Sequence, residues 1–575
     1  MADRFEIARA LREIGALLEL EGENPFKVRA YENGARAVEG LAGDVGAAVD
    51  AGRLTDVPGI GEALAKKIGE LHRTGTTALL ERLRAKHPPG TLELLRVPEL
   101  GPRKAAALQA ALGVAGVADL ERACLEGRVR GVKGFGERTE QRILEGIRRM
   151  RARDADPRVL LVDALDAGAA LLAWLRGSPA AARVELAGSA RRFRETVADL
   201  DLVAASADPA AVAARLAAHP LVAEVLARGD AKATVRLASG LAVELRIAAP
   251  EDFPALLHHA TGSRAHHAKL REMAREAGYT LSEGGLYTVS DATKVRIASE
   301  EDLYATLGLR PVPPELREDE GELEAARDGT LPDDLVRGED VRGLVHCHTT
   351  WSDGRATLLE MARAAEALGA EYLTVTDHSR SAGYAGGLDE DRLRRQWDEL
   401  ARVQEQVKIR LLRGTESDVL EDGALDYPDR ILEQLDVVVA SVHSRMRMDE
   451  DQMTRRLVRC MSLPVFKIWG HALGRLLLDR EPFACRVEEV LDALAASRGA
   501  VEVNGDPRRL ELEPRWLRAA TARRIPIVLS VDAHATRDLG HLRFAVGTAR
   551  RGWVRRGDVL NALPVEGFRA AVRPA

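Results

Sequence analysis

Histidine and carboxylate side chains recur at the ends of predicted strands in the last part of the chain. No structural role requires so many imidazoles and carboxylates at strand ends, whereas a cluster of two or three metal ions that activates water does. Such a ligand set suits zinc, manganese or iron better than calcium or magnesium alone. The predicted ligands are His346, His348, Asp353, His378, Glu416, His443, His471, Asp532 and His534.

Three residues beside these ligands have two interpretations each. Asp377 precedes His378, where it either orients a ligand imidazole or caps the end of a strand. Arg445 and Arg475 follow ligand positions, where they either hold a substrate phosphate or stay solvated or salt-bridged. The sequence leaves these alternatives open.

A second set of carboxylates lies earlier in the chain. Asp199 and Asp201 are two residues apart in a predicted strand, so their side chains face the same way and can share two magnesium ions. Glu244, on a neighbouring predicted strand, is placed to supply a third carboxylate. Upstream of them, three residues can hold a triphosphate through backbone, hydroxyl and guanidinium contacts: Gly188, Ser189 and Arg192.

Three glycine turns at residues 57–61, 97–101 and 132–136 resemble one another, and a helical pattern rich in alanine and basic residues follows each. A glycine turn leaves the first N–H groups of the next helix open to a DNA phosphate, without reading base sequence. The second turn is less typical, because Glu99 stands where a glycine is usual. The predicted DNA-contacting glycines are Gly59, Gly61, Gly101, Gly134 and Gly136.

The elements that must position these residues change in type along the chain. Residues 1–150 are typical of short amphipathic helices, and residues 151–250 of a small α+β unit followed by helices. Prolines and an acidic run around residues 311–324 predict a solvated linker, which we place at residues 318–340. From residue 341 onward, seven strand–helix units predict a parallel barrel similar to a TIM barrel, with the ligands at the C-terminal strand ends.

Composition excludes several classes of protein. Hydrophobic residues at 46% and charged residues at 30% are typical of a globular chain, and the net charge of −6 excludes a strongly basic nucleic-acid binder. DNA binding must therefore rest on local geometry. Four scattered cysteines without a CxxC pair argue against a disulfide framework and fit the cytoplasm. The charged N-terminus is neither a signal peptide nor a membrane span, so no membrane partner is expected.

The C-terminal motifs resemble a known superfamily. HCHTTWSDG, TDHS, GTE, SVHS, GH and DAH are similar to the successive motifs of the PHP (polymerase and histidinol phosphatase) superfamily over roughly residues 341–570. The resemblance implies a distorted, seven-stranded TIM-like barrel whose three metal ions, Zn²⁺ or Mn²⁺, hydrolyse phosphoesters. A metal-bound water with a lowered pKa would attack phosphorus, and the metals would stabilise the attacking and leaving oxygens.

The earlier motifs resemble another family. GSARR followed by DLD, together with the glycine turns as helix-hairpin-helix motifs, is similar to the family X DNA polymerases over about residues 1–317. With the PHP motifs, the order is that of the bacterial family X polymerases. The resemblance implies a lyase-like helical domain (1–85), a fingers-like helix-hairpin-helix domain (86–150), a nucleotidyltransferase palm (151–250), a thumb (251–317) and a PHP domain (341–575).

The resemblance also implies a function in base excision repair. The chain would fill gaps in DNA from dNTPs with Mg²⁺ or Mn²⁺, and its PHP domain would act as a 3′–5′ exonuclease and abasic-site endonuclease. Ser189 and Arg192 match the family's triphosphate binders, and Asp199 and Asp201 match its metal carboxylates. The segment of the thumb that touches the incoming nucleotide and template matches Thr261, Gly262, Ser263 and Arg271.

A third activity is implied at the first glycine turn. Lys67 matches the Schiff-base lysine of animal family members that excise deoxyribose phosphate, and Lys27 and Tyr31 match the surrounding pocket. A lysine amine of lowered pKa can attack an abasic aldehyde. The alternative is that Lys67 simply contacts a DNA phosphate.

Three departures from the family pattern fall in the polymerase part. Glu244 replaces an aspartate, His259-Ala260 replaces a Tyr-Phe pair near the sugar, and His267 replaces an asparagine. A carboxylate displaced by about 1 Å can cost about 100-fold in rate, so we expect weak or manganese-dependent polymerisation beside an intact nuclease. One alternative is a PHP nuclease whose polymerase part only binds DNA, and another is a small-molecule phosphatase. We expect a cytoplasmic monomer that acts on gapped, nicked or abasic DNA.

Overall fold

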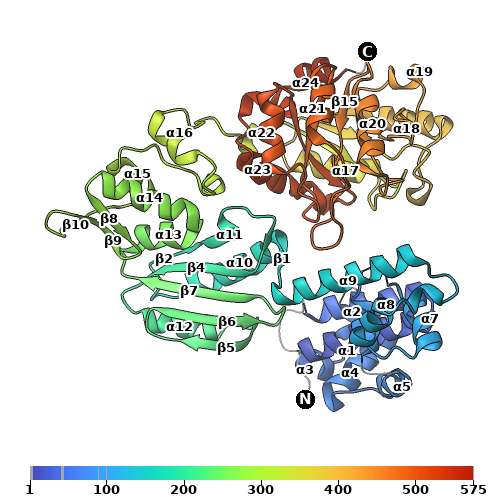
Figure 1. The fold of residues 1–575 in the computed structure, drawn as a ribbon, viewed down its shortest axis with the longest axis horizontal. Coiled ribbons are helices and arrows are strands. Elements are labelled where there is room, and N and C mark those ends of the chain that lie inside the picture. The colour runs from blue at the N-terminus through green and yellow to red at the C-terminus, as the bar shows by residue number, and fades with distance from the viewer. Residues whose placement is uncertain (1–3, 40–44, 58, 88–89, 99, 574–575) are drawn as a thin grey trace. The chain divides into compact units, whose positions relative to one another are not determined.

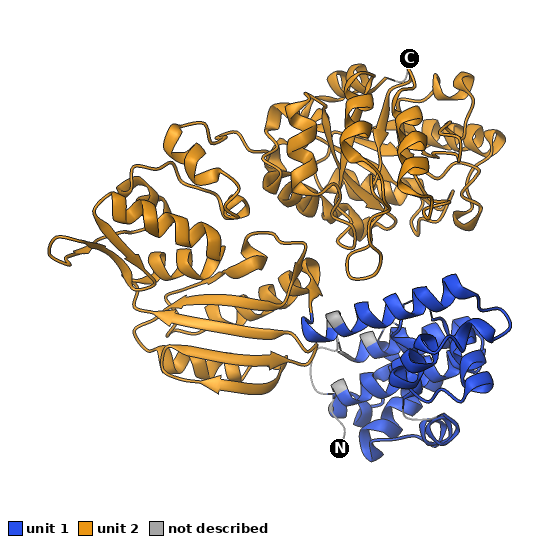
Figure 2. Cartoon of the chain, in the orientation of Figure 1, with its two compact units in different colours: residues 1–157 blue, residues 158–575 orange. Residues whose placement is uncertain are grey.

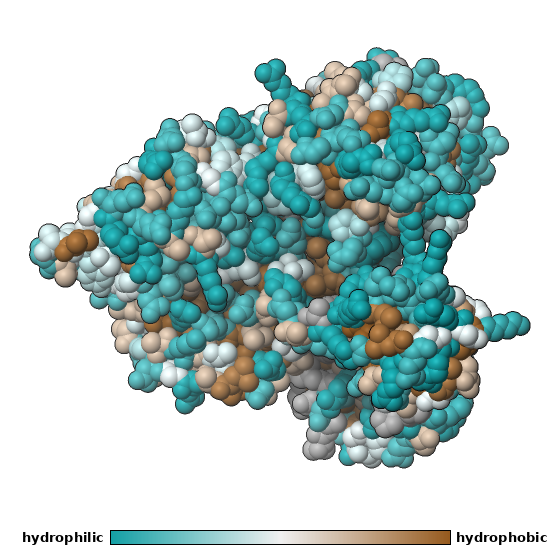
Figure 3. Space-filling view, viewed as in Figure 1, coloured by the Kyte–Doolittle hydropathy of each residue, from teal (hydrophilic) through white to brown (hydrophobic). Residues whose placement is uncertain are grey.

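A computed structural model divides the chain into two compact units, residues 1–157 and 158–575 (Figure 2). The residues it describes are 4–39, 45–57, 59–87, 90–98 and 100–573. None of the helices in these ranges is long and apolar enough to cross a membrane. On the face drawn in Figure 3, hydrophilic residues cover most of the surface and the hydrophobic patches are small and separate. The finer domain boundaries stay predictions.

The first unit is helical, which confirms the expectation for residues 1–150 (Figure 1). Its α-helices are α1 (Arg4–Leu20), α2 (Pro25–Glu39), α3 (Val45–Asp50), α4 (Glu62–Thr74), α5 (Ala78–Lys86), α6 (Thr91–Leu95), α7 (Pro102–Leu112), α8 (Val117–Leu125) and α9 (Glu137–Ala155). Apolar side chains at helical spacing, such as Leu11, Ile14 and Leu18 of α1, are at most 2% exposed in one continuous core.

The palm is a five-stranded sheet in the order β2-β4-β7-β6-β5, in which only β4 and β7 pair in parallel. The strands are β2 (Arg183–Leu186), β4 (Asp199–Ala205), β5 (Val222–Arg228), β6 (Lys232–Leu237) and β7 (Ala242–Ala248). Leu200 and Val243 point into the core beneath helices α10 (Leu161–Arg176) and α12 (Pro209–Ala217). Alternation along each strand therefore places Asp199, Asp201 and Glu244 on the opposite face.

The thumb follows the palm. It comprises α13 (Phe253–Thr261), α14 (Arg264–Glu276), the antiparallel strands β8 (Tyr279–Ser282), β9 (Gly285–Thr288) and β10 (Lys294–Val295), and α15 (Glu300–Thr306). Phe253, Leu256 and Leu257 of α13 pack against Val203 of β4, which fixes the thumb to the palm sheet.

The predicted solvated linker is wrong, because the segment 318–340 packs on the thumb and, at Val336, on the barrel. Helix α16 (Glu322–Asp328) buries Leu323, and the thumb core also includes Leu331 and Leu335. Glu322 is 0% exposed and its Oε1 lies 2.6 Å from Nδ1 of His266. Apolar residues within and after the acidic run therefore anchor the segment.

The C-terminal part is a closed barrel of seven parallel strands in chain order, as predicted. The strands are β11 (Gly343–Cys347), β12 (Tyr372–Val375), β13 (Arg410–Asp418), β14 (Val437–Ser441), β15 (Lys467–Trp469), β16 (Gly499–Asn504) and β17 (Ile527–Ala533), and β17 pairs with β11. The longer helices between and after them are α17 (Leu358–Ala367), α18 (Glu390–Gln404), α20 (Glu450–Met461), α21 (Val487–Ala495), α22 (Pro514–Ala522), α23 (Leu542–Arg551) and α24 (Val565–Val572).

Inside the second unit, the palm packs directly on the barrel. Phe193, just after the Gly188–Arg192 turn, lies 6.0 Å from Phe544 between ring centroids, and its ring fills the space beside Gly547. Glu195 forms an ion pair of 3.0 Å with Arg551 of α23. The loop that precedes the palm carboxylates is therefore anchored to the barrel.

Candidate active sites

All nine predicted ligands of the barrel gather at its C-terminal strand ends. Glu416, 1% exposed on β13, lies at the centre of the cluster. One carboxylate oxygen lies 2.8 Å from Nε2 of His471 and 3.1 Å from Nε2 of His443, and the other lies 2.9 Å from Nδ1 of His378. The loop after β11 adds Asp353, whose oxygens lie 3.6 Å from His378 and 3.5 Å from His534.

The donor set fits several metal ions. Three groups of side chains have ligand atoms within 4.8 Å of one another. The groups are His348, Asp353, His378 and His534; His346, His348 and Asp532; and His378, Glu416 and His443. Among the described residues, the buried Nε2 atoms of His346 and His348 have no hydrogen-bond partner. Buried nitrogens without a partner, converging on carboxylates, are what a metal centre requires.

The charges of the cluster point the same way. Burial, with His534 and His378 beside it, lowers the pKa of His348 to about 3, so this imidazole is neutral and free to ligate. Burial opposes a charge on His378, but Glu416 and Asp353 raise its pKa to about 10. The carboxylates therefore hold a positive charge at His378 that a metal ion can supply instead of a proton.

Two side chains of the sixth strand support the ligands, and the sequence analysis did not single them out. Glu502 of β16 accepts the backbone N–H of His471, and its Oε1 lies 2.5 Å from Nδ1 of His346. Asn504 donates to Oδ2 of Asp532 at 3.1 Å. Such partners fix the tautomer and orientation of ligands. The signal in the sequence was two polar residues at alternate positions of the apolar strand AVEVNG.

Arg509 was also missed. It follows β16, and its Nε lies 3.5 Å from Oδ2 of Asp532. Its side chain is 17% exposed, and within the described part of the chain its buried Nε and Nη1 make no hydrogen bond. A guanidinium held at the ligands with donors to spare is suited to a phosphate.

The structure decides between the alternatives for two of the residues beside the ligands. Arg475 donates to the carbonyl oxygens of Arg509 and Leu510 and contacts Glu513, so it is structural and the phosphate role is wrong. Asp377 accepts from Thr349 and its neighbours on the loop that leads to Asp353. It orders that loop, and among the described residues it bonds to no imidazole.

The palm carboxylates form the second centre. Strand register places Asp201 directly beside Glu244. Burial, with Asp199 and Glu244 nearby, raises the pKa of Asp201 to about 7, and divalent cations would relieve this repulsion. Gly188 allows the close approach of the turn, because a Cβ there would lie 1.9 Å from Oδ2 of Asp201.

The predicted nucleotide-binding residues lie around this centre. Ser189 is half-buried in the short helix α11 (Gly188–Arg191). Arg192 donates to the carbonyl oxygen of Thr261, and its Nη1 would lie 3.2 Å from a Cβ on Gly262. Arg271 is exposed on α14. The pKa of His267 is lowered mainly by burial and further by the charges of His259 and Arg271. The turn and the thumb segment are therefore brought together.

The three glycine turns share one backbone hydrogen bond. The N–H groups of Ile60, Leu100 and Phe135 donate to the carbonyl oxygens of Val57, Val97 and Val132 at 3.0, 3.1 and 2.9 Å. Gly59 and Gly134 have φ angles of 94° and 90°. Pro58 and Glu99 lie outside the described residues. A Cβ would meet no atom within 4 Å at Gly59, Gly61, Gly101, Gly134 or Gly136, so each turn is open.

Family models match along the chain in the order of these features. A helix-hairpin-helix domain matches residues 3–77, a SAM-like helix-hairpin-helix tandem 91–149, a DNA polymerase beta thumb 256–318 and a PHP domain 345–505. The DNA polymerase/3′-5′ exonuclease PolX of Bacillus subtilis (strain 168) is 34% identical over 571 residues, 99% of both chains.

The chain belongs to the bacterial family X DNA polymerases that carry a PHP domain.

Other relatives match parts of this family X chain. A probable phosphatase of Thermoanaerobacter sp. (strain X514) is 27% identical over 231 residues, 38% of this chain and 88% of its own. The human DNA-directed DNA/RNA polymerase mu is 40% identical over 76 residues, 13% of this chain and 15% of its own.

The departures from the family X pattern have structural counterparts. Glu244 is engaged by Lys232 and Arg246, each at 2.7 Å, and Arg192 by Glu318 at 3.0 Å. At two other replaced positions, Nδ1 of His259 lies 3.2 Å from Nε2 of His267. Groups expected to hold metal and nucleotide therefore have partners within the chain.

The lyase residues of the family X pattern lie on two helices. Lys67 is half-buried on α4, and Tyr31 is 5% exposed on α2. Lys27 forms an exposed ion pair of 2.7 Å with Glu23. A catalytic role for Lys67 stays a prediction.

Proposed function

We propose that this chain is a DNA repair enzyme that fills gaps by template-directed polymerisation and degrades DNA by 3′–5′ exonuclease and abasic-site endonuclease action. The observation that carries the proposal is the presence of two separate metal-type centres on one chain of the family X order. Its substrates are gapped, nicked or abasic DNA and dNTPs, and it acts as a monomer.

In the barrel, all nine predicted ligands hold the metal ions, which we propose to be three Zn²⁺ or Mn²⁺. When bound, such ions supply an activated water and a Lewis acid at phosphorus. Glu416 offers both oxygens to the centre, and Glu502 and Asn504 keep His346 and Asp532 in place. Arg509 faces the same ligands and can neutralise the non-bridging oxygens of the scissile phosphate.

In the palm, Asp199, Asp201 and Glu244 hold Mg²⁺ or Mn²⁺ while Ser189 and Arg192 hold the triphosphate. Glu244 and Arg192 must first give up their partners Lys232, Arg246 and Glu318. This exchange supports weak or manganese-dependent polymerisation beside an intact nuclease.

The decisive experiment separates the two centres. Nucleotide incorporation on a one-nucleotide gap is measured with Asp201→Ala, and degradation of a 3′ end with His443→Ala. We expect each variant to lose one activity and keep the other. Degradation that survives His443→Ala would refute the barrel assignment, and a wild type that degrades DNA but never incorporates nucleotides would favour a nuclease with a DNA-binding palm.

The lyase role proposed for Lys67 has its own test. Borohydride is added to the protein on abasic DNA, and we expect a trapped adduct that Lys67→Ala abolishes. If wild type yields no adduct, the lyase role is refuted and the phosphate contact is the alternative that is left.

A further inference from the structure

A groove lined by arginines lies on the barrel outside the metal cluster. Its volume is about 620 Å³, and it is lined by Arg445, Arg447, Arg455, Arg456 and Arg459 together with two carboxylates, Glu421 and Asp422. The whole chain carries a net charge of −6, so this excess of positive charge is local. Local positive charge on an acidic protein indicates an anionic ligand.

The residues that line the groove follow two strand ends of the metal centre in the chain. Arg445 is two residues after His443, a predicted ligand whose Nδ1 lies 3.0 Å from Asp418 at the end of β13. The chain then runs from Asp418 into the groove wall at Glu421. Both walls are therefore direct continuations of strand ends that carry the cluster.

A buried arginine joins the two walls. Arg456 is 2% exposed and donates to the carbonyl oxygens of Leu420 and Ser444, each at 2.9 Å, and of Val419. Because its guanidinium donates to backbone carbonyl oxygens, Arg456 holds the two walls together and the other arginines line the groove.

Two of the lining arginines have exchangeable partners. Arg455 and Arg459 lie four residues apart on α20, so they share one helix face. Arg445 pairs with Glu421 and Arg459 with Asp422, both at 3.5 Å, with all four side chains at least 58% exposed. Exposed pairs contribute at most about 1 kcal/mol, so phosphates can replace the carboxylates.

We propose that this groove binds the phosphodiester backbone of the single DNA strand whose end enters the barrel metal centre. The proposal rests on the nuclease function proposed above and adds the path of its substrate. Guanidinium groups bind phosphate oxygens through paired N–H donors and carry no base information. The groove therefore holds a strand of any sequence, which suits an enzyme that degrades DNA ends.

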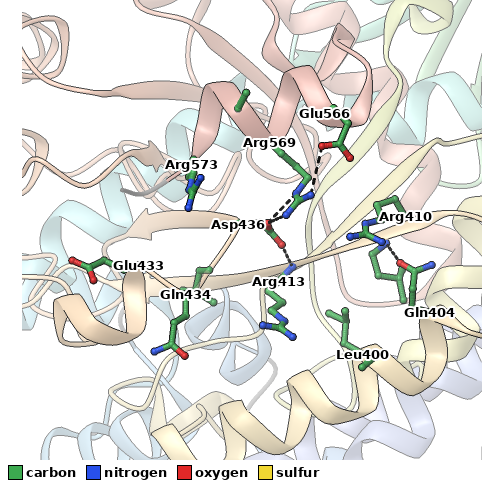
Figure 4. A pocket seen from close by; sticks show the side chains of 14 residues that line it. Leu400, Gln404, Arg410, Arg413, Glu433, Gln434, Asp436, Glu566, Arg569 and Arg573 are labelled. Atoms are coloured by element: carbon green, nitrogen blue, oxygen red, sulfur yellow. Dashed lines mark hydrogen bonds and ion pairs between the residues drawn. The ribbon is translucent and has the colours of Figure 1, made fainter.

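The barrel offers a matched control at its other end. A second pocket of about 730 Å³ lies where β13 and β14 begin, roughly 20 Å of strand from Glu416 (Figure 4). Arg569 there is held by Asp436 at 3.0 Å and Glu566 at 3.6 Å. Arg410 and Arg573 are exposed in this pocket and can be removed without touching the groove.

The test compares Arg455→Ala/Arg459→Ala with Arg410→Ala/Arg573→Ala in the full chain. Exonuclease KM is measured on a single-stranded oligonucleotide at several salt concentrations, beside hydrolysis of bis(p-nitrophenyl) phosphate, which has no extended backbone. We expect the groove variant to have a KM for the oligonucleotide about tenfold above wild type. The slope of log KM against log salt concentration should fall by about 1.4, because two phosphate contacts are lost. The groove variant should hydrolyse the small diester at the wild-type rate, and the control variant should match wild type in every measurement. Arg455→Lys/Arg459→Lys should keep most of the salt slope.

A second measurement does not depend on hydrolysis. An oligonucleotide with 4-thiothymidine near its 3′ end is photocrosslinked to the protein, and we expect adducts in the peptide of residues 444–459 that the groove variant loses. Equal KM, slope and crosslinking in the groove variant and wild type would overturn the proposal. A wild type without any hydrolysis would instead refute the nuclease function, while the crosslink would still decide where the strand lies.

Discussion

Arg509 shows how much chemistry a single side chain can add to a metal cluster. It touches Asp532 at 3.5 Å and keeps buried donors unused among the described residues. The ligands could be predicted from the sequence because histidine and carboxylate rarely recur at strand ends unless they bind metal. Arg509 could not be predicted, because arginines are common in loops and only the fold brings this one to the centre.

Removal of Arg509 should damage turnover more than metal binding. We expect Arg509→Ala to lower exonuclease kcat about 100-fold, the usual effect of deleting one donor to developing charge, with metal content unchanged by elemental analysis. Arg509→Lys should recover part of the loss because it keeps the charge. Activity of Arg509→Ala within about threefold of wild type would show that the guanidinium does not reach the phosphate.

In the palm, Glu244 is the residue whose replacement is expected to change the rate most clearly. A shorter carboxylate would withdraw from Lys232 and Arg246, which hold it at 2.7 Å, and would remain beside Asp201. We expect Glu244→Asp to raise magnesium-dependent incorporation on a one-nucleotide gap at least about tenfold, given the sensitivity of rate to displacements of about 1 Å. Glu185→Asp on β2 is the control. Brisk extension by wild type with magnesium, with no gain from the substitution, would contradict the prediction.

The glycine turns are the elements on which we expect DNA binding to depend. Gly59 and Gly75 both have positive φ angles, 94° and 74°, and open surroundings, but Gly75 only ends α4. Alanine at either position should cost about 1 kcal/mol of stability. Only Gly59→Ala should also weaken binding of nonspecific duplex DNA, about fivefold for one lost hydrogen bond. Equal affinities of the two variants by fluorescence anisotropy would remove the first turn from the DNA interface.

Strand β15 carries a buried lysine whose charge depends on pH. Lys467 is 0% exposed, and burial lowers its pKa to about 8. Between about pH 8 and the ordinary lysine pKa of about 10.4, the unfolded chain holds the proton more tightly, so stability rises with pH in this window.

Lys467→Met removes this dependence. We expect the Tm of the variant, relative to wild type, to be highest at pH 7 and to decline towards pH 10, by an amount equivalent to on the order of 1–3 kcal/mol. The lost hydrogen bonds to Leu463 and Ser497 shift both ends of the comparison alike. A Tm difference that is constant with pH would mean that Lys467 stays charged in the fold.

Elements differed in how far the sequence predicted them. Alternating strands and helices from residue 341 predicted the seven-stranded barrel, because the pattern repeats and most of the strands are mainly apolar. The segment 318–340 was wrongly predicted as linker because the acidic run hid the spacing of Leu323, Leu331 and Leu335. Glu322 could not be foreseen, since its partner His266 is distant in sequence.

At the scale of the whole second unit, the palm depends on the barrel. Burial opposes ionisation of Glu195, but Arg551 and Arg475 lower its pKa, so it is charged at the joint. Ser189 and Arg192 lie just before Glu195 in the chain. Arg551→Met would leave a buried carboxylate short of a partner.

We expect Arg551→Met to raise the KM for dNTPs in gap filling several-fold while exonuclease turnover stays close to wild type. Glu195→Gln/Arg551→Met should recover part of the dNTP affinity, because the unpaired carboxylate of Glu195 is removed as well. Steady-state kinetics of both reactions on the same preparations measure the two effects. A dNTP KM unchanged by Arg551→Met would show that the joint does not position the nucleotide loop.

The contact of Phe193 with Phe544 and Gly547 also bears on how such genes can decay. A lineage can inactivate the nuclease by replacing one histidine, and the palm then keeps its contact with the barrel. Deleting the barrel is a different event, because it exposes Phe193 and removes Arg551, the ion-pair partner of Glu195. Descendants of this architecture that abandon DNA degradation should therefore retain a barrel stripped of its ligands more often than a gene that stops after the thumb.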